Sequence, residues 1–217
     1  MKLIKTSIFS VLAVIVLSGC TNQSTNQPKD KGSKSDASNV KVNADKQNVS
    51  FQKLLPFENI SFDIRTEGDG SIKKLFIHPS GLKEKNQDIE MEIDGMVKDA
   101  QVADLNSDQY PELLIFTQSA GSGSYGKLVA FSVNHGKSMS QVYFPPVDED
   151  PVLKKGYMGH DKFLIEDNIL VLEFPLYKPG DPNSNPTGGI RRVEYKLVEG
   201  EASRKFEPGK ISETPSK

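Results

Sequence analysis

Apolar residues occupy every second position through much of this chain, and this alternation restricts its fold more than any other feature. Such a period is typical of a β-strand with one face buried. Four segments show it clearly: 60–64, 89–93, 129–133 and 193–197. Two more segments, 113–116 and 169–172, are continuously apolar and predict strands at the centre of a sheet. Helical periodicity is missing, apart from a short helical turn that we expect at 50–55.

Turn sequences rich in glycine, proline, asparagine and aspartate separate these strands, at 67–70, 134–136 and 179–182. Short strands joined by such turns are typical of an antiparallel β-sandwich or barrel. We therefore predict an all-β fold with a single sandwich-like or barrel-like domain at 50–200, where about 150 residues suffice for a hydrophobic core. The polar segment 201–217 is predicted to be a flexible tail.

The N-terminal segment has the features of an export signal. Two lysines precede a short apolar run at 8–17, which is about half the length of a membrane-spanning helix. The following residues, Leu17-Ser18-Gly19-Cys20, resemble the lipobox of bacterial lipoproteins, in which the cysteine is lipidated. The resemblance implies a signal peptide at 1–19 and a lipid membrane anchor at Cys20. We therefore expect an exported cell-envelope lipoprotein, attached to the outer membrane if the source has one.

Composition indicates how the chain is organised and which classes of partner it excludes. The segment 20–49 is polar and nearly free of apolar side chains, so we predict a disordered linker between the anchor and the folded domain. Cys20 is the only cysteine, which argues against a disulfide framework and a cysteine metal site. The chain has 27 basic and 29 acidic residues. Because nucleic acids require a basic surface, this balance argues against a nucleic-acid partner.

The segment 119–126, Ser-Ala-Gly-Ser-Gly-Ser-Tyr-Gly, joins two predicted strands and carries one tyrosine among small residues. Glycine and serine allow such a loop to adapt its shape, whereas the tyrosine ring provides rigid contact area at low entropic cost. We therefore predict a protruding loop that enters a cleft of another molecule. Lys127, next to the loop, is expected either to approach a carboxylate there or to be a solvated lysine at the strand end.

Two enzymatic motifs fail in this loop. Residues 121–127 satisfy most of a nucleotide-binding Walker A pattern, but Leu128 replaces the hydroxyl that holds Mg²⁺, and a strand rather than a helix follows. Neither Ser122 nor Ser124 has glycines two positions away on both sides, as the nucleophile elbow of hydrolases requires. The three histidines occur in turn-like segments without a shared spacing. We therefore expect a protein that is not an enzyme.

A second segment, 104–112, is rich in oxygen ligands. Asp104, Asn106, Asp108 and Glu112 stand at positions where a tight loop can surround Ca²⁺. The segment resembles the calcium loop of FG-GAP repeats, although glutamine stands at position 109, where that pattern prefers glycine. The alternative is a turn in which the Asp and Asn side chains bond their own backbone. We expect no required cofactor, and a structural Ca²⁺ stays open.

Several segments in this order resemble the PliI family, the periplasmic inhibitors of invertebrate-type lysozyme. The resemblance runs from about 99 to 197. It rests on D-x-N-x-D-x-x-P-E-L at 104–113, the loop 119–126, N-H-G-K-S at 134–138, Y-F-P at 143–145 and G-G-I-R-R-V-E-Y at 188–195. The resemblance implies a β-sandwich that binds lysozyme by inserting the loop core, Ser122, Gly123, Ser124 and Tyr125, into the active-site cleft. Ser122 and Tyr125 would make the inhibitory contacts, and the resemblance also allows a homodimer.

The chemistry of lysozymes agrees with this implication. Lysozymes cleave sugar chains with a pair of carboxyl groups, and hydroxyl groups can pair with either protonation state of a carboxyl. The leading hypothesis is therefore a membrane-anchored lysozyme inhibitor. An alternative is a calcium-dependent adhesion or glycan-binding envelope lipoprotein that uses the segment 104–112. A third hypothesis is an envelope assembly or sensing lipoprotein whose loop contacts a different protein.

Overall fold

The computed structural model describes residues 48–216. The predicted signal peptide 1–19, the lipidation site Cys20 and nearly all of the linker 20–49 lie outside the described residues. Within 48–216, no helix is long and apolar enough to span a membrane.

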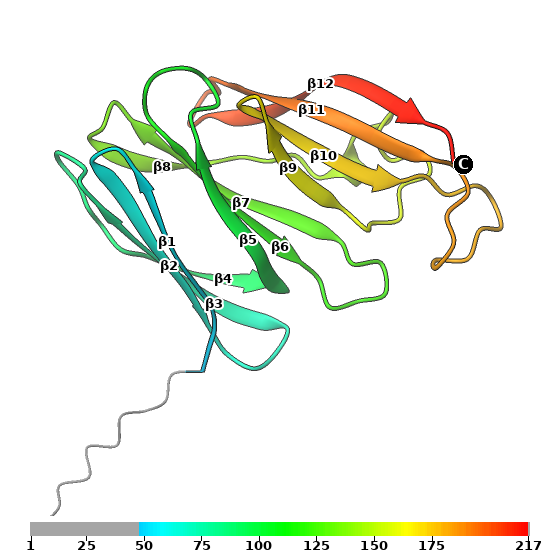
Figure 1. Ribbon diagram of the computed structural model, residues 1–217, viewed down its shortest axis with the longest axis horizontal. Helices are drawn as coiled ribbons and strands as arrows, with labels where there is room; N and C mark the ends of the chain where they lie inside the picture. Colours follow the sequence, from blue (N-terminus) through cyan, green and yellow to red (C-terminus); the bar gives the residue numbers. More distant parts are fainter. Residues whose placement is uncertain (1–47, 217) are drawn as a thin grey trace, which may run out of the picture. The chain divides into compact units, whose positions relative to one another are not determined.

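The described residues form three antiparallel sheets of four strands each, which confirms the predicted all-β fold (Figure 1). The first sheet has the order β1-β2-β3-β4, the second β5-β6-β7-β8 and the third β12-β11-β10-β9. The strands are β1 (Val49–Phe57), β2 (Ile60–Glu67), β3 (Ile72–Ser80), β4 (Ile89–Asp94), β5 (Met96–Ala103), β6 (Glu112–Gln118), β7 (Gly126–Asn134), β8 (Ser138–Val142), β9 (Lys162–Glu166), β10 (Ile169–Pro175), β11 (Ile190–Val198) and β12 (Lys205–Thr214). One short 3₁₀ helix, η1 (Val147–Glu149), follows β8.

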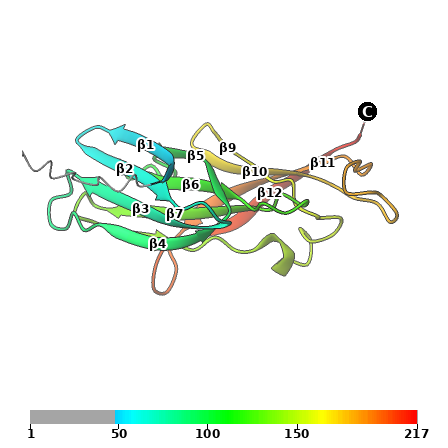
Figure 2. The same ribbon diagram turned by 90° about the horizontal axis from the view of Figure 1, so that it is seen from below.

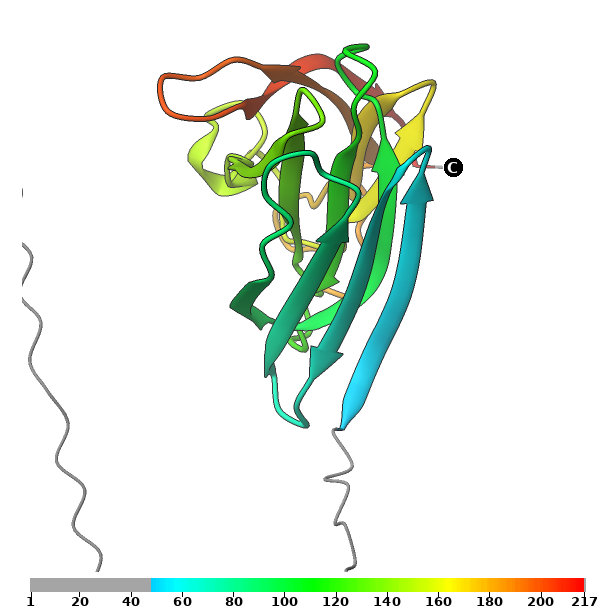
Figure 3. The ribbon, with the colours of Figure 1, turned by 90° about the vertical axis from the view of Figure 1, so that its left-hand side faces the viewer.

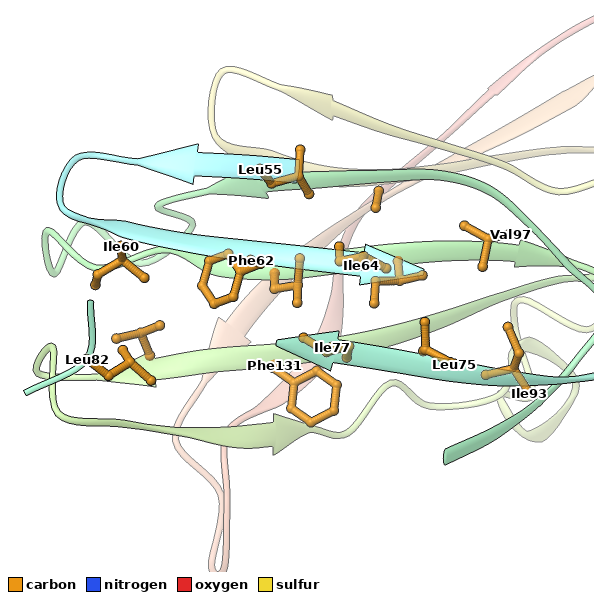
Figure 4. Packing of buried hydrophobic residues seen from close by; sticks show 14 residues of the cluster. Leu55, Ile60, Phe62, Ile64, Leu75, Ile77, Leu82, Ile93, Val97 and Phe131 are labelled. Carbon is orange, nitrogen blue, oxygen red and sulfur yellow. The ribbon is translucent and has the colours of Figure 1, made fainter. Parts of the chain in front are cut away.

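The three sheets form three layers with two hydrophobic cores between them, so the sandwich has one layer more than the usual two. The first core lies between the first and second sheets and includes Phe62, Ile77 and Phe131 (Figure 4). The second core lies between the second and third sheets and includes Leu114, Leu172 and Phe206. In Figure 1 the blue-to-teal strands of the first sheet and the yellow-to-red strands of the third lie on opposite sides of the green central strands, and Figures 2 and 3 show the same sheets from two other directions.

Strand β6 lies between the two cores and contributes side chains to both. Leu113 and Ile115 point into the first core, whereas Leu114 and Phe116 point into the second. Since side chains alternate between the faces of a strand, a strand covered on both faces must be apolar at every position. The continuous apolar run at 113–116 predicted a strand at the centre of a sheet, and the structure confirms it: β6 lies between β5 and β7, and all four side chains are buried.

The segment 50–55 forms most of β1, so the predicted helical turn is wrong. Along β1 the side chains alternate between more and less buried positions, and Leu55 reaches the first core. The sequence hid this period because Lys53 stands at an inward position. Its ammonium group is satisfied by the carboxylate of Asp99 at 2.7 Å and the carbonyl of Ala100 at 2.9 Å.

The predicted flexible tail 201–217 is also wrong, because residues 205–214 form strand β12. Main-chain pairing with β11 extends from Val198 opposite Lys205 to Ile190 opposite Thr214. Phe206 is the one buried side chain of β12, and the rest of the strand is mostly polar and largely exposed, with Ile211 as an exposed apolar residue. The backbone ladder therefore holds this strand, and such a ladder leaves little trace in the sequence. Around Phe206, main-chain bonds at Tyr143 also join the second sheet to the third.

Candidate functional site

The loop 119–126 joins β6 to β7 and lies at the end of the molecule where the loop after β10 also lies (Figures 1 and 2). Its backbone closes on itself. The amide of Ser119 donates to the carbonyl of Tyr125 at 2.9 Å, and the amide of Ser124 donates to the carbonyl of Gly121 at 2.9 Å. Ser124 has a φ of 44°, in the left-handed region that few non-glycine residues adopt. The loop therefore has one defined, compact shape.

The four predicted contact residues differ in their exposure. Ser122 is exposed, Gly123 and Ser124 are half-buried, and the side chain of Tyr125 is 43% exposed. The Tyr125 ring lies over Gly123, where a Cβ atom would come within 2.4 Å of the ring. The ring also contacts Tyr157 edge to face, with 5.7 Å between the ring centroids. Tyr125 thus presents one part of its ring to solvent and packs the other part against the protein.

Residues from a different part of the chain hold the backbone of the loop. The amide of His160 donates to the carbonyl of Gly123 at 2.7 Å. The side-chain amide of Asn183 donates to the carbonyl of Ser122 at 2.7 Å. The carboxylate of Asp161 accepts the amide of Gly126 at 2.7 Å. We call Tyr157, His160, Asp161 and Asn183 the loop support. The backbone of the loop is therefore held by the loop support, and its insertion into a cleft stays a prediction.

Burial shifts the titration of two groups in the loop support. The pKa of the Asp161 carboxyl is raised, mainly by its burial, although the bonds from Gly126 and Tyr157 act in the opposite direction. The pKa of the Tyr157 hydroxyl is also raised, first by burial and then by the neighbouring Asp161. The Tyr157 hydroxyl therefore stays protonated, and it donates a hydrogen bond to the Asp161 carboxylate at 2.8 Å.

A hollow of about 360 Å³ lies beside the loop. It is lined by Tyr125, Phe144 and Tyr157, with Lys127 and Asp148 at its polar side. The ammonium group of Lys127 pairs with the carboxylate of Asp94 at 3.0 Å, and both side chains are about half exposed. Lys127 is therefore a partly exposed lysine at the strand end that already has a carboxylate partner within the protein.

The three histidines have separate partners. His78 contacts Asp88 at 2.5 Å, His135 meets the ring of Tyr110 edge to face, and His160 stacks on Tyr177. His78 and His135 are exposed, whereas His160 is half-buried within the loop support.

The segment 104–112 lies at the other end of β6 and forms a turn whose side chains bond their own backbone. The Asp104 carboxylate accepts the amides of Asp108 and Gln109, and the Asn106 carbonyl oxygen also accepts the amide of Asp108. Among residues 48–216, no group of three or more acidic, histidine or cysteine side chains is arranged to hold a metal ion. The oxygens of Asp104, Asn106 and Asp108 thus accept amides of the turn's own backbone. Calcium binding at 104–112 stays a prediction.

Arg204 pairs with two of the four predicted ligand residues, Asp108 and Glu112. Its guanidinium group, which comes from the connection between β11 and β12, contacts Asp108 at 3.0 Å and Glu112 at 3.6 Å and also bonds the Ser132 hydroxyl. Glu112 is fully buried and accepts bonds from Ser132 at 2.7 Å and from the amide of Leu105 at 2.9 Å. Burial nevertheless dominates and raises the pKa of Glu112 to about 6.

This raised pKa predicts a pH-dependent effect of Glu112→Gln. The folded state holds the Glu112 proton more tightly than the unfolded state, so the contribution of this group to stability is full at low pH and is lost as pH rises through about 6. Glutamine resembles the protonated acid and removes this loss. We expect the destabilisation caused by Glu112→Gln to be about 2 kcal/mol smaller at pH 7.5 than at pH 4. Urea unfolding at both pH values measures the difference, and equal destabilisation would contradict the assignment.

Comparison with known proteins identifies one family model that matches part of the chain. Residues 82–154 match the model of the family described as PliI, periplasmic lysozyme inhibitor of I-type lysozyme. The match begins earlier and ends earlier than the predicted resemblance at 99–197, and it includes both the loop 119–126 and the turn 104–112. No curated protein and no solved structure matches the chain significantly. With an all-β fold and this match over 82–154, the chain is PliI-like, that is, similar to the periplasmic inhibitors of I-type lysozyme.

Proposed function

We propose that this protein is an exported lipoprotein, anchored through Cys20, that inhibits an invertebrate-type lysozyme by inserting the loop 119–126 into the active-site cleft. The observation that carries the proposal is the position of the loop inside the family match. The matched family is described as inhibitors of I-type lysozyme. The loop core, Ser122 to Tyr125, lies within the matched residues, and both Ser122 and Tyr125 are exposed.

The shape of the loop supports this role. Inhibitors bind tightly when the contact segment already has its bound shape, because less conformational entropy is then lost on binding. The closed backbone of the loop and its bonds to His160, Asp161 and Asn183 provide such an arrangement. At the surface, Ser122 offers a hydroxyl and Tyr125 offers a half-exposed ring with its hydroxyl. Both hydroxyls suit a cleft that contains carboxyl groups.

The hollow beside Tyr125 adds a second supporting feature. An inserted loop needs room next to it for the rim of the cleft that it enters. The hollow is lined mainly by aromatic and aliphatic side chains, which favour contact with another protein over contact with water. We infer that the rim of the lysozyme cleft occupies this hollow when the loop is inserted.

A titration of the soluble domain, residues 48–217, against invertebrate-, chicken- and goose-type lysozymes tests the proposal. We expect inhibition of the invertebrate-type enzyme at submicromolar concentration and weaker or no inhibition of the other two. Calcium is not part of the proposed contact, so EDTA is expected to leave both the inhibition and the melting temperature unchanged. Absence of inhibition of all three enzymes at micromolar concentrations of the domain would overturn the proposal. Inhibition that disappears with EDTA would indicate a calcium-dependent role of the turn 104–112.

A further inference from the structure

We propose that Asp161 is the positioning residue of the loop 119–126. Its carboxylate holds the base of the loop and, through Tyr157, fixes the direction of the Tyr125 ring. The use of the loop against lysozyme rests on the proposed function, whereas the positioning of the loop by Asp161 is a property of the fold and can be tested by itself.

One oxygen of Asp161 makes both relevant contacts. Oδ2 accepts the amide of Gly126 at 2.7 Å and the hydroxyl of Tyr157 at 2.8 Å. Gly126 is the last residue of the loop and the first of β7, so the first bond sets where the loop ends. The approach is close, because a Cβ atom at Gly126 would lie 2.6 Å from the Cβ atom of Asp161. Only glycine at this position allows the carboxylate to reach the backbone.

The second contact connects the loop to the second core. The ring of Tyr157 packs edge to face against Phe174, a buried residue of β10, with 4.8 Å between the ring centroids. On its other side Tyr157 meets Tyr125. The bond from the Tyr157 hydroxyl to Asp161 fixes the tilt of the ring, and the ring in turn is the surface on which Tyr125 rests. The chain of contacts from Asp161 to Tyr125 therefore has one intermediate, Tyr157.

The support and the loop belong to different parts of the chain. The family match covers 82–154, which contains the loop but neither Tyr157 nor Asp161. The bond between Asp161 and Gly126 joins residues 35 positions apart, and the bond from Asn183 to Ser122 joins residues 61 positions apart. The positioning of the loop is thus a feature of this chain that the matched segment alone does not contain.

A tryptophan reporter tests the positioning without any lysozyme. The sequence contains no tryptophan, so Tyr125→Trp introduces a single tryptophan fluorophore into the loop. In this background, Asp161→Ala is expected to lower the fluorescence anisotropy of the reporter and to weaken its near-ultraviolet circular dichroism, because the loop gains freedom. Asp161→Asn keeps one carbonyl oxygen that can accept both bonds, and is expected to restore both signals. Unchanged anisotropy in Asp161→Ala, in a folded protein, would overturn the proposal.

Inhibition provides the second measurement. In the chain that retains Tyr125, Asp161→Ala is expected to weaken inhibition about tenfold, whereas Asp161→Asn should stay near the original value. Asn86→Ala is the matched control, because the Asn86 side chain, like that of Asp161, makes two hydrogen bonds; both go to the backbone of Leu82 in the connection between β3 and β4. Asn86→Ala should change neither the fluorescence anisotropy of the reporter nor the inhibition constant.

The outcomes separate this proposal from the proposed function. If the unsubstituted protein inhibits no lysozyme, the proposed function fails, and the reporter still decides whether Asp161 positions the loop. If the unsubstituted protein inhibits and Asp161→Ala inhibits equally well, the positioning role is overturned. Tyr157→Phe removes only the hydroxyl that donates to Asp161 and serves in place of Asp161→Ala should that variant not fold. It is expected to shift both measurements in the same direction by a smaller amount.

Discussion

Tyr125→Ala is expected to weaken inhibition of an invertebrate-type lysozyme by about a hundredfold, since exposed aromatic anchors often contribute the largest share of binding energy at an interface. Ser122→Ala should weaken it by about tenfold, the effect of losing one hydrogen bond to a charged group. Inhibition constants from a cell-wall lysis assay measure both effects. The fold should be unaffected, because the substituted side chains are exposed or half-exposed.

Tyr143→Ala is the control for Tyr125→Ala. Tyr143 is also an exposed tyrosine, 54% accessible, and it lies beyond β8, outside the loop. Its main-chain bonds to Arg204 and Phe206 do not depend on its side chain. We expect its inhibition constant to match that of the unsubstituted protein. A similar loss in both tyrosine variants would indicate a contact surface other than the loop.

Arg204→Met should be among the most destabilising substitutions on a polar residue of the described chain, with an expected loss of about 3 kcal/mol at pH 7.5. It leaves the buried carboxylate of Glu112 without its cation and removes the bonds to Asp108 and Ser132. At pH 5 the loss should be smaller, because Glu112, whose pKa burial already raises to about 6, is then largely protonated. Denaturant unfolding at both pH values provides the measurement.

Arg192→Met is the matched control for this substitution. Arg192 pairs with two carboxylates, those of Glu166 and Glu173, and Arg204 with three, but the Arg192 side chain is 28% exposed against 11% for Arg204. Exposed ion pairs contribute little because water screens them, so we expect a loss of no more than about 1 kcal/mol. Equal losses for the two arginines would show that burial of Glu112 does not control the effect.

Strands with a regular apolar pattern were predictable from sequence, whereas β1, with Lys53 at an inward position, and β12, held mainly by backbone pairing, were not. The alternation at 60–64 and the continuous run at 113–116 indicated β2 and β6, because burial of a side chain selects an apolar residue. Strand β12 has only Phe206 in the core, so its sequence looked like a tail. The third layer was not predicted either, since period two shows that one face is buried but not what covers it.

The site shows the same division. The loop 119–126 was visible in the sequence because its composition is unusual and strands lie on both sides of it. Its support was not visible, because His160, Asp161 and Asn183 are ordinary polar residues far along the chain. One local signal did exist at Gly159, where φ is +87° and a Cβ atom would come within 2.1 Å of the Gly123 carbonyl oxygen. A glycine followed by polar residues is too common a pattern to identify such a contact in advance.

The bonds that hold the loop end on main-chain atoms, namely the carbonyls of Ser122 and Gly123 and the amide of Gly126. The side chains at Ala120 and Ser122 take no part in them, so selection can exchange these residues while the backbone path stays the same. Under the proposed function, the residues that contact the target are therefore separate from those that maintain the scaffold. In a contest between an inhibitor and a changing enzyme, this separation makes the loop evolvable, because new surface chemistry can be tried without loss of stability.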